Sequence, residues 1–326
     1  MNDYMVETRG LSKRYRRNGP LALQSLNLQV SRGSLFGFVG PNGAGKTTTL
    51  RMLAGLLQPS EGEIIIAGQP VHQDPWAVRR YVGYMPDFFG VYQNMTAWEY
   101  LDFFARCHDL PLERRGRVVT ELLELVNLAH KRDEDVGSLS RGMQQRLCLA
   151  QALVHDPAVL LLDEPASGLD PRARVEMREL LRELTALGKT IILSSHILSE
   201  LAEMCDEVGI IEHGRIVASG PLASLQQRAQ TGRVLRLHVL SDPTAAADAL
   251  AGFPEVRNVA QLNGSRDETA ESHGWLEAYL AGDAHSAADL LTHLVSNGVA
   301  VAEFRQVGND LEELFLQLTT GEGSEK

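Results

Sequence analysis

Residues 40–48 read Gly40-Pro41-Asn42-Gly43-Ala44-Gly45-Lys46-Thr47-Thr48, which matches the G-x-x-x-x-G-K-[ST] pattern of a phosphate-binding loop. The run before it, residues 35–39, is short and apolar and suits a buried strand. After the loop, one face of a predicted helix collects the apolar residues Leu50, Leu53, Ala54 and Leu57. Strand, glycine-rich turn and helix therefore follow one another, which is the context that this motif requires.

The loop predicts a site for a nucleoside triphosphate. Glycines let the backbone pass close to a polyphosphate, and the N–H groups at a helix N-terminus point at the anion. Lys46 is expected to reach the β- and γ-phosphates, and the Thr47 hydroxyl to hold Mg²⁺. The alternative is a glycine-rich turn that only closes a strand–helix corner. It is disfavoured because strand, helix, lysine and threonine are all in place.

The composition describes a large globular chain. At 326 residues it is long enough for two domains, and 44% hydrophobic with 22% charged residues is ordinary. A formal net charge of -11 argues against nonspecific binding to nucleic acid. No apolar run approaches the length of a membrane span, so any membrane role is expected to pass through a partner chain. Three widely spaced cysteines read as reduced thiols of a cytosolic protein.

Strands alternate with helices along most of the chain, which indicates a layered α/β core. A small antiparallel sheet is expected from residues 4–9 and 26–30, where apolar and polar side chains alternate. Helical patterns cover residues 96–129, in more than one helix, then the stretch after Ser140 to about 154, and 173–187. Further strands are expected at 63–67, 79–87, 159–162 and 190–195, with a closing hairpin at 208–211 and 215–218.

Three residues at strand ends extend the predicted site. Asp163 follows four apolar residues and is the expected second partner of Mg²⁺, directly or through water. Glu164, next to it, could orient and deprotonate an attacking water. His196 ends another strand of the same sheet, on the γ-phosphate side; the alternative, a structural histidine, is less consistent with that position. Tyr15, among basic residues, either stacks on an adenine ring or is a half-buried strand tyrosine.

These segments, in this order, resemble the ATP-binding subunit of ATP-binding cassette (ABC) transporters. The resemblance covers residues 4–220 and rests on the Walker A loop, the signature at residues 139–144, the Walker B strand at 159–164, the D-loop at 167–170 and the switch histidine at 196. It implies a P-loop NTPase α/β core with an antiparallel β subdomain and a helical insertion at about 95–155. It also supports Tyr15 as the aromatic residue of the adenine loop.

The resemblance implies a shared site and a membrane partner. Two subunits would sandwich two ATP molecules, each site joining the Walker residues of one chain to Ser140 and Gly142 of the other. A helix N-terminus after Ser140 suits this role, because it is an anion site. ATP and Mg²⁺ are the implied cofactors, and a separate integral membrane permease and a second ATPase copy are the implied partners. The chain would lie in the cytoplasm, peripheral to the inner face of the membrane.

Two positions depart from the family pattern. Asp87 stands at the end of the strand before the insertion, where a glutamine is usual. It could still meet Mg²⁺ or water, with a shorter reach and a charge. In the signature, Arg141 and Met143 replace the commoner glycine and glutamine, while Ser140 and Gly142 are retained. Residues 309–316 are similar to the ending of bacterial exporter-type ATPases, which favours export.

The C-terminal part differs in character. Residues 1–221 are expected to form the ATP-binding domain, and residues 222–326 a small α+β domain with the order β-α-β-β-α-β and a trailing helix near 310–319, a ferredoxin-like pattern. This domain carries no motif with chemistry; it could sense a ligand or form homodimers.

The expected docking groove for a permease is the insertion from Met95 to Ala129 with the aromatic loop at 88–92, although those aromatics could equally pack the insertion onto the core. The alternative function is a soluble ABC ATPase that acts on ribosomes or DNA.

Overall fold

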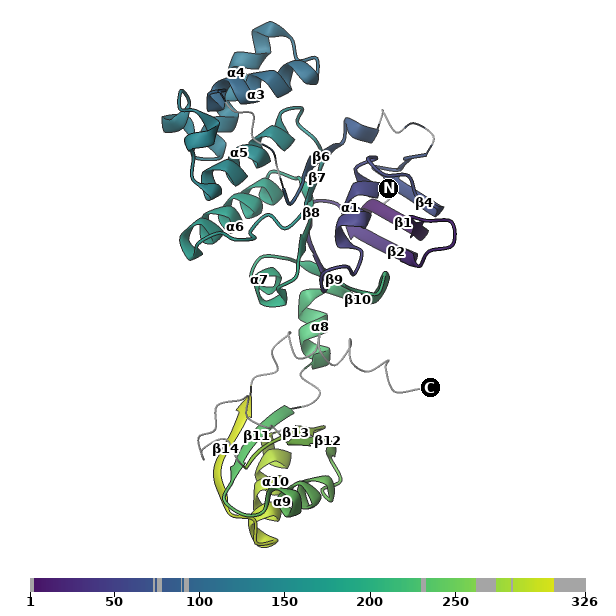
Figure 1. Cartoon of the computed structure of the whole chain (residues 1–326), viewed down its shortest axis with the longest axis vertical. Helices are drawn as coiled ribbons and strands as arrows, with labels where there is room; N and C mark the ends of the chain where they lie inside the picture. The colour runs from purple at the N-terminus through teal and green to yellow at the C-terminus, as the bar shows by residue number, and fades with distance from the viewer. Residues whose placement is uncertain are drawn as a thin grey trace. The chain divides into compact units, whose positions relative to one another are not determined.

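The computed structural model describes residues 3–72, 74, 78–88, 90, 94–229, 233–261, 274–282 and 284–307. The chain divides into two compact units, Met1–Leu222 and Ala223–Lys326 (Figure 1). Each unit has its own sheets and its own hydrophobic core, so the two are described separately.

A six-stranded sheet forms the centre of the first unit. Its strands are β3 (Leu35–Val39), β6 (Val82–Met85), β7 (Val159–Leu162), β8 (Thr190–Ser195), β9 (Glu207–Glu212) and β10 (Arg215–Pro221). They run in the order β10-β9-β3-β8-β7-β6, and every neighbouring pair except β9 and β10 is parallel. Every residue of β3, β7 and β8 is buried, which fits the apolar sequences of β3 and β7 and the apolar middle of β8. Because these strands are parallel, their carboxyl ends meet at one edge of the sheet.

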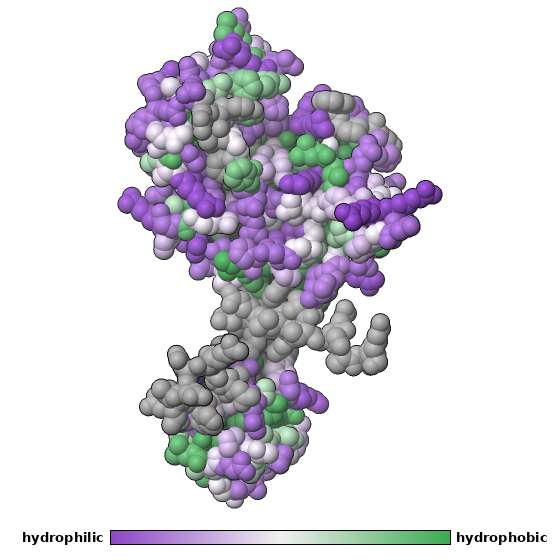
Figure 2. Space-filling model, viewed as in Figure 1, coloured by the Kyte–Doolittle hydropathy of each residue, from purple (hydrophilic) through white to green (hydrophobic). Residues whose placement is uncertain are grey.

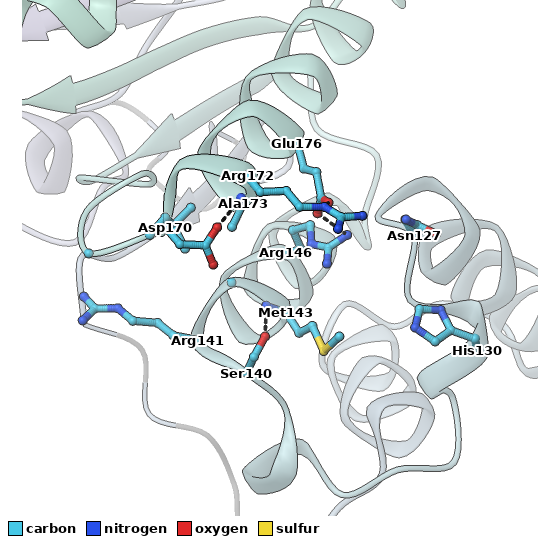
Figure 3. Close-up of a pocket in the computed structure, with 13 residues that line it drawn as sticks. Asn127, His130, Ser140, Arg141, Met143, Arg146, Asp170, Arg172, Ala173 and Glu176 are labelled. Carbon is cyan, nitrogen blue, oxygen red and sulfur yellow. Dashed lines mark hydrogen bonds and ion pairs between the residues drawn. The ribbon is translucent and has the colours of Figure 1, made fainter.

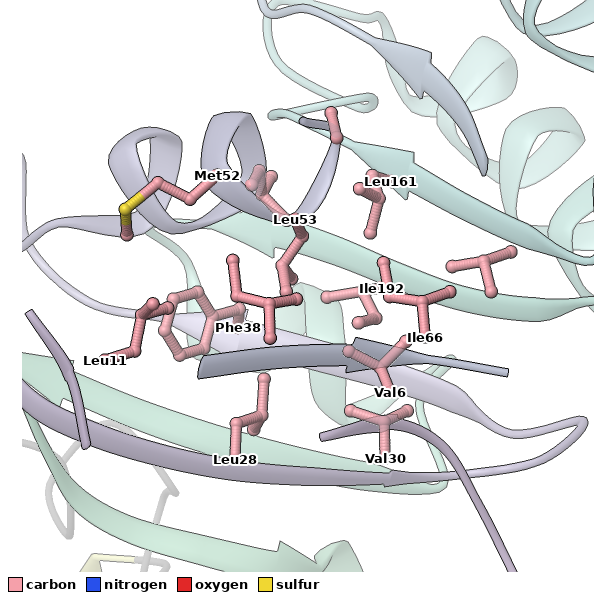
Figure 4. Close-up of a cluster of buried hydrophobic side chains, with 14 of the residues drawn as sticks. Val6, Leu11, Leu28, Val30, Phe38, Met52, Leu53, Ile66, Leu161 and Ile192 are labelled. Carbon is pink, nitrogen blue, oxygen red and sulfur yellow. The ribbon is translucent and has the colours of Figure 1, made fainter. Parts of the chain in front are cut away.

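An antiparallel sheet covers one face of this core. It comprises β1 (Tyr4–Arg14), β2 (Leu21–Ser31), β4 (Glu61–Ile66) and β5 (Gln69–Pro70), in the order β2-β1-β4-β5. Helix α1 (Lys46–Leu53) lies between the two sheets (Figure 1). The cluster between them joins Val6, Leu11, Leu28, Val30 and Ile66 of the antiparallel sheet to Phe38, Met52, Leu53, Leu161 and Ile192 (Figure 4). Burial of these side chains fixes α1, and with it the loop that precedes α1.

Helices cover the other face of the six-stranded sheet (Figure 1). They are α3 (Ala97–Cys107), α4 (Leu112–Leu125), the short η1 (Ala129–Lys131) and η2 (Val136–Ser138), α5 (Arg141–Leu153), α6 (Pro171–Ala186) and α7 (Leu198–Ala202). Helix α3 begins with a capping box, in which Thr96 and Glu99 each accept a hydrogen bond from the other's backbone N–H.

Several element bounds differ from the sequence predictions, and three of the differences have a clear description. Helix α1 ends at Leu53, with Gly55 in the left-handed region at φ 68°, so Leu57 does not continue its apolar face. Strand β6 begins at Val82 rather than at Arg79, because residues 78 and 79 form a helical turn. In the other direction, β1 extends to Arg14 and absorbs half of the segment expected to lie between two strands.

The second unit has the ferredoxin-like order that the sequence predicted. After α8 (Leu222–Ala229), which begins at the division, come β11 (Arg233–Val239), α9 (Pro243–Ala251), β12 (Val256–Gln261), β13 (Trp275–Leu280), α10 (Ala284–Ser296) and β14 (Val301–Val307). The four strands are antiparallel throughout, in the order β12-β13-β11-β14. Leu235, Leu237 and Val239 of β11 pack with Leu250, Leu290 and Leu294 of the two helices. The helix expected near 310–319 and the segment 309–316 lie outside the described residues.

The face of the first unit seen in Figure 2 is mainly hydrophilic, with smaller hydrophobic areas, and two of the cysteines are buried as free thiols. Among the residues that the structure describes, no helix combines the length and the apolar character that crossing a bilayer requires. Cys148 and Cys205 are buried free thiols, and burial raises the pKa of Cys148 to about 12, so this thiol stays protonated and unreactive.

Candidate nucleotide-binding site

The predicted phosphate-binding loop lies at the carboxyl edge of the six-stranded sheet. It connects β3 to α1, while Asp163 and Glu164 follow β7 and His196 follows β8. Strand β8 lies between β3 and β7 in the sheet. The sequence-predicted residues from three separate segments are therefore gathered at adjacent strand ends, which is the place where open α/β sheets bind ligands.

The glycines of the loop are required for different reasons. A Cβ atom on Gly40 would lie 2.2 Å from the backbone oxygen of Ile211, and one on Gly45 would lie 2.7 Å from Cδ2 of Leu23. Gly43, at φ 85°, has open space around it but a backbone conformation that other residues rarely adopt. Close packing therefore requires glycine at position 40, backbone conformation requires it at position 43, and both require it at position 45, where φ is 113°.

Lys46 is the first residue of α1, and its side chain turns back inside the loop. Only 6% of the residue is exposed. Its ammonium group donates hydrogen bonds to the backbone oxygens of Gly40, at 2.6 Å, and Pro41, at 3.3 Å. The Nζ atom also lies 3.6 Å from Oε1 of Glu164. The loop therefore holds a positive charge against its own backbone oxygens and beside the Glu164 carboxylate.

Asp163 is buried at the end of β7, with 1% of its surface exposed. Its Oδ1 atom accepts hydrogen bonds from the hydroxyls of Thr47, at 3.1 Å, and Ser194, at 2.7 Å. Its Oδ2 atom is buried and has no hydrogen-bond partner within the described part of the chain. A buried carboxylate oxygen without a partner is costly, so this atom needs a ligand.

Glu164 connects the loop to the histidine. Its Oε2 atom lies 2.9 Å from Nδ1 of His196, while Oε1 faces Lys46. The backbone of Glu164 is in the left-handed region at φ 51°, and its N–H donates to the Ser194 hydroxyl at 3.0 Å. Both carboxylate oxygens thus have a nitrogen group beside them at the mouth of the loop.

Tyr15 and Asp87 lie at the margins of this site. Tyr15 is 60% exposed, and its hydroxyl is 3.0 Å from that of Thr48, at the end of the phosphate-binding loop. Lys13 Nζ lies 5.7 Å from the centroid of the tyrosine ring. Asp87 is exposed just beyond β6, next to β7 in the sheet. Within the described residues, no hydrogen bond or ion pair joins Asp87 to Thr47 or Asp163.

The signature residues line a separate pocket of about 380 Å³ (Figure 3). Ser140 is the N-cap of α5 and accepts a hydrogen bond from the backbone of Met143 at 3.4 Å. The N-terminus of α6, capped by Asp170, borders the same pocket. A Cβ atom on Gly142 would lie 3.1 Å from that of Ala173, so the small residue lets the two helices approach. No hydrogen bond of the described residues joins Ser140 or Gly142 to the phosphate-binding loop.

One site residue was missed by the sequence analysis. Ser194 contacts both acids of the site, as given above, although it looked like part of an apolar strand. The sequence shows only that a hydroxyl residue follows the apolar residues 191–193, two positions before His196, and this does not identify its partners.

The fold and the gathered residues define a P-loop nucleotide-binding protein. The family model described as ABC transporter matches residues 23–167. The Nod factor export ATP-binding protein I of Burkholderia orbicola (strain AU 1054) is 41% identical over 248 residues, which cover 76% of this chain and 81% of that protein. The uncharacterized ABC transporter ATP-binding protein YxlF of Bacillus subtilis (strain 168) is 35% identical over 317 residues, covering 96% and 99%.

Solved structures of ABC transporter subunits are also similar to this chain. The ATP-binding subunit of an ABC transporter aligns with a TM-score of 0.61 and 31% identity, over 69% of this chain and 92% of that one. The cbiO1 protein of Clostridium perfringens, part of the ABC transporter complex cbiONQ, aligns with a TM-score of 0.62 and 29% identity, over 69% and 91%. The chain belongs to the family of ABC transporter ATP-binding subunits. It binds a nucleotide and, as a member of this family, hydrolyses ATP.

Proposed function

We propose that the chain powers export through a separate membrane permease, working as a pair of copies that hold two Mg-ATP between them. The observation that carries the catalytic part of the proposal is the cluster of Lys46, Asp163, Glu164 and His196 at one sheet edge, with Glu164 between lysine and histidine.

Lys46, Thr47 and Asp163 hold the phosphates and the metal. Lys46 Nζ is presented within the loop at 2.6 Å from the Gly40 oxygen, where a β- or γ-phosphate oxygen would find it. The residues fit Mg²⁺, because the unpartnered Asp163 Oδ2 and the nearby Thr47 hydroxyl are hard oxygen donors. When bound, Mg²⁺ would neutralise charge on the phosphate groups. Asp87, exposed beyond β6, would help to hold Mg²⁺ directly or through water.

Glu164 handles the attacking water. The water oxygen bonds to the γ-phosphorus, the bond from that phosphorus to the oxygen bridging it to ADP breaks, and the water proton passes to the Glu164 carboxylate. His196 is 2.9 Å from that carboxylate and 45% of its side chain is exposed, so it can contact both Glu164 and a γ-phosphate. Tyr15, exposed beside Thr48, offers its ring face to the adenine.

The second copy completes the site. Ser140 and Gly142 begin α5, whose N-terminus carries backbone N–H groups and the positive end of the helix dipole. In the proposed pair they contact the γ-phosphate of the ATP that the other copy holds through Lys46. ATP would then join the two copies, and its hydrolysis would release them.

Relatives and one exposed aromatic residue support the permease partner and the direction of transport. The relatives named for Nod factor export span most of this chain, which supports export. Phe88 is 88% exposed next to the helical insertion and is the proposed contact to the permease; Phe89, Val91 and Tyr92 lie outside the described residues. The chain would then sit on the inner face of the membrane without entering it, and we expect no nucleic-acid partner.

A mixing experiment tests the shared site. The Lys46→Ala chain and a chain carrying both Ser140→Ala and Gly142→Asp are expected to be inactive alone. Together they form one intact site per mixed dimer, made of the Walker residues of one chain and the signature of the other, so hydrolysis returns. Mixed dimers demonstrated by affinity capture, yet without hydrolysis, would contradict the model.

Cross-linking tests the permease contact. Phe88→Cys in a chain co-expressed with its permease is expected to form a cross-linked product. Leu187→Cys is the control, since Leu187 is another exposed apolar residue, at the end of α6 on a different part of the unit. Equal cross-linking from both positions would remove Phe88 from the docking surface.

A further inference from the structure

We propose that Ser194 is a positioning residue of the nucleotide site, whose single hydroxyl orients Asp163 toward the metal and Glu164 toward the water. The inference rests on the proposed function, since it concerns Mg-ATP bound at that site. It concerns a residue of β8 that belongs to none of the predicted motifs.

The hydroxyl of Ser194 is fully engaged. The residue is 0% exposed, in a strand that lies between β3 and β7. It donates to Asp163 Oδ1 at 2.7 Å and accepts from the backbone N–H of Glu164 at 3.0 Å. A serine hydroxyl has one hydrogen to donate, so the short bond to Asp163 uses it completely. One side chain therefore touches both acids, which neighbour each other in the sequence.

The first consequence concerns the metal-binding carboxylate. Ser194 and Thr47 both donate to Oδ1 of Asp163, which leaves Oδ2 as the free atom. If the Thr47 hydroxyl binds the metal instead of Asp163, the hydrogen bond from Ser194 to Oδ1 remains. That bond would then keep the Asp163 carboxylate in its orientation. Hydrogen bonds of this kind to metal-binding carboxylates orient them and tune their affinity.

The second consequence concerns the backbone of Glu164. This residue is in the left-handed region at φ 51°, which a glutamate adopts only when its surroundings impose it. The N–H of Glu164 donates to the Ser194 hydroxyl, which supports that conformation. The direction in which the Glu164 side chain leaves the strand end, toward Lys46 and His196, follows from it.

The adjacent serine is a matched control. Ser195 is also buried at the end of β8, but its hydroxyl accepts from the backbone of Ile197 at 3.0 Å and reaches Glu200 at 3.5 Å. It contacts the start of α7 and neither acid of the site. Loss of either hydroxyl removes the same atom from the same strand, and only Ser194 should affect the metal.

The experiment measures equilibrium binding of ADP to the full chain by calorimetry, with and without Mg²⁺, and uses Ser194→Ala and Ser195→Ala. For Ser194→Ala we expect unchanged metal-free ADP affinity and an apparent Mg²⁺ affinity weaker by about 10- to 100-fold. For Ser195→Ala we expect both affinities within about twofold.

A second variant guards against misfolding. Ser194→Cys keeps the side chain's shape with a weaker donor, and we expect it to show the same loss of Mg²⁺ affinity in a smaller measure. If ADP binding by Ser194→Ala and Ser194→Cys depended on Mg²⁺ in the same way as ADP binding by Ser195→Ala, the inference would be wrong. The proposed function would be unaffected by that result. A wild-type chain whose ADP binding and hydrolysis ignore Mg²⁺ would overturn both.

Discussion

The two units of the molecule bury different kinds of side chain. Among the described residues, every buried polar or charged side chain belongs to the first unit, including Lys46, Thr49, Asp163, Ser194 and Ser195. The buried side chains described in the second unit are all apolar. Burial of a polar group is costly unless it is paired, so the first unit carries more of this cost. In the described part of the second unit, the polar burial is confined to single atoms such as Ser241 Oγ and Glu255 Oε2. Lys46, Asp163 and Ser194 are the members of the first unit's set that lie at the nucleotide site.

The difference follows from the two sheets. In the first unit, parallel strands place the ends of β3, β7 and β8 at one edge, so residues far apart in sequence meet there. In the second unit, antiparallel neighbours send consecutive strand ends to opposite edges. A parallel sheet thus brings functional groups from several strands together at one edge. An antiparallel sheet can pack one face on the core and leave the other exposed, without bringing such groups together. The predictions below test this division.

The largest effect is expected from Glu164→Gln. The amide keeps the shape but cannot accept the water proton, so steady-state hydrolysis should fall by about 10²–10⁴-fold while ATP binding persists. Phosphate release and equilibrium ATP binding are the measurements.

Glu277→Gln is the matched change in the second unit. Glu277 pairs with Arg236 at 2.7 Å on the four-stranded sheet, and its loss should leave hydrolysis within about twofold, since exposed or partly exposed pairs contribute little. Unchanged phosphate release by Glu164→Gln, or a large loss of hydrolysis in Glu277→Gln, would contradict the assignment of the chemistry to the first unit.

A core substitution in the second unit should separate stability from nucleotide binding. Leu237 is completely buried in β11, so Leu237→Ala should cost about 2–5 kcal/mol of that unit's unfolding free energy. Since the nucleotide residues belong to the other unit, ADP affinity should stay within about twofold. Denaturant unfolding and calorimetric ADP titration test this; a parallel loss of both quantities would show that the units depend on each other.

Tyr15 tests the exposed margin of the site. Tyr15→Ala removes the ring proposed to face the adenine and should weaken ADP binding by about 1–3 kcal/mol, the range measured for base–aromatic stacking. Tyr15→Phe keeps the ring and loses only the contact with the Thr48 hydroxyl, so it should bind nearly as the wild type does. Equal weakening in both variants would assign the role of Tyr15 to its hydroxyl instead.

The smallest effect concerns a histidine pair away from the site. His155 stacks on His108 with 4.0 Å between ring centroids, and its Nε2 atom is 3.1 Å from the backbone oxygen of Val82. Burial, followed by the neighbouring His108, lowers the pKa of His155 to about 4, against opposing effects of Asp156 and two backbone hydrogen bonds. The folded chain therefore resists protonation at a pH where the unfolded chain accepts it.

The sign of the pH effect follows. Between the ordinary pKa of 6.5 and about 4, the unfolded state binds more protons, so stability falls as the pH falls through this window. The unfolding midpoint should drop by about 2–4 °C from this group, which allows for the partial exposure of the ring. His155→Phe, which keeps the stacked ring, should flatten this part of the profile, while His72→Phe at an exposed position should not. Identical thermal profiles for the wild type and His155→Phe would exclude the effect.

Much of the fold and site could be predicted because local patterns and topology agreed. The loop at 40–48, the acids after β7 and the histidine after β8 each followed an apolar run, and parallel strands bring such ends together. The order of the second unit was predictable for a related reason, since its alternating strands and amphipathic helices are regular.

Other features depend on contacts that no local pattern contains. The Leu57 prediction failed for a different, local reason, because a left-handed glycine, Gly55, ends α1 early. Gly40 and Gly45 looked like phosphate contacts, yet Ile211 and Leu23 require them to be small. Ser194 was overlooked because its importance comes from two partners on a neighbouring strand end. Such tertiary demands become visible only when the strands are placed beside each other.

The backbone of Glu164 has a consequence for the evolution of this protein. A glutamate held in the left-handed region costs the fold of the order of 1–3 kcal/mol, whereas glycine adopts that conformation freely. Replacement by glycine would thus favour a more heat-resistant molecule that no longer turns over its substrate. Selection for thermal stability alone would replace Glu164. A descendant that keeps this glutamate has therefore been selected for ATP turnover.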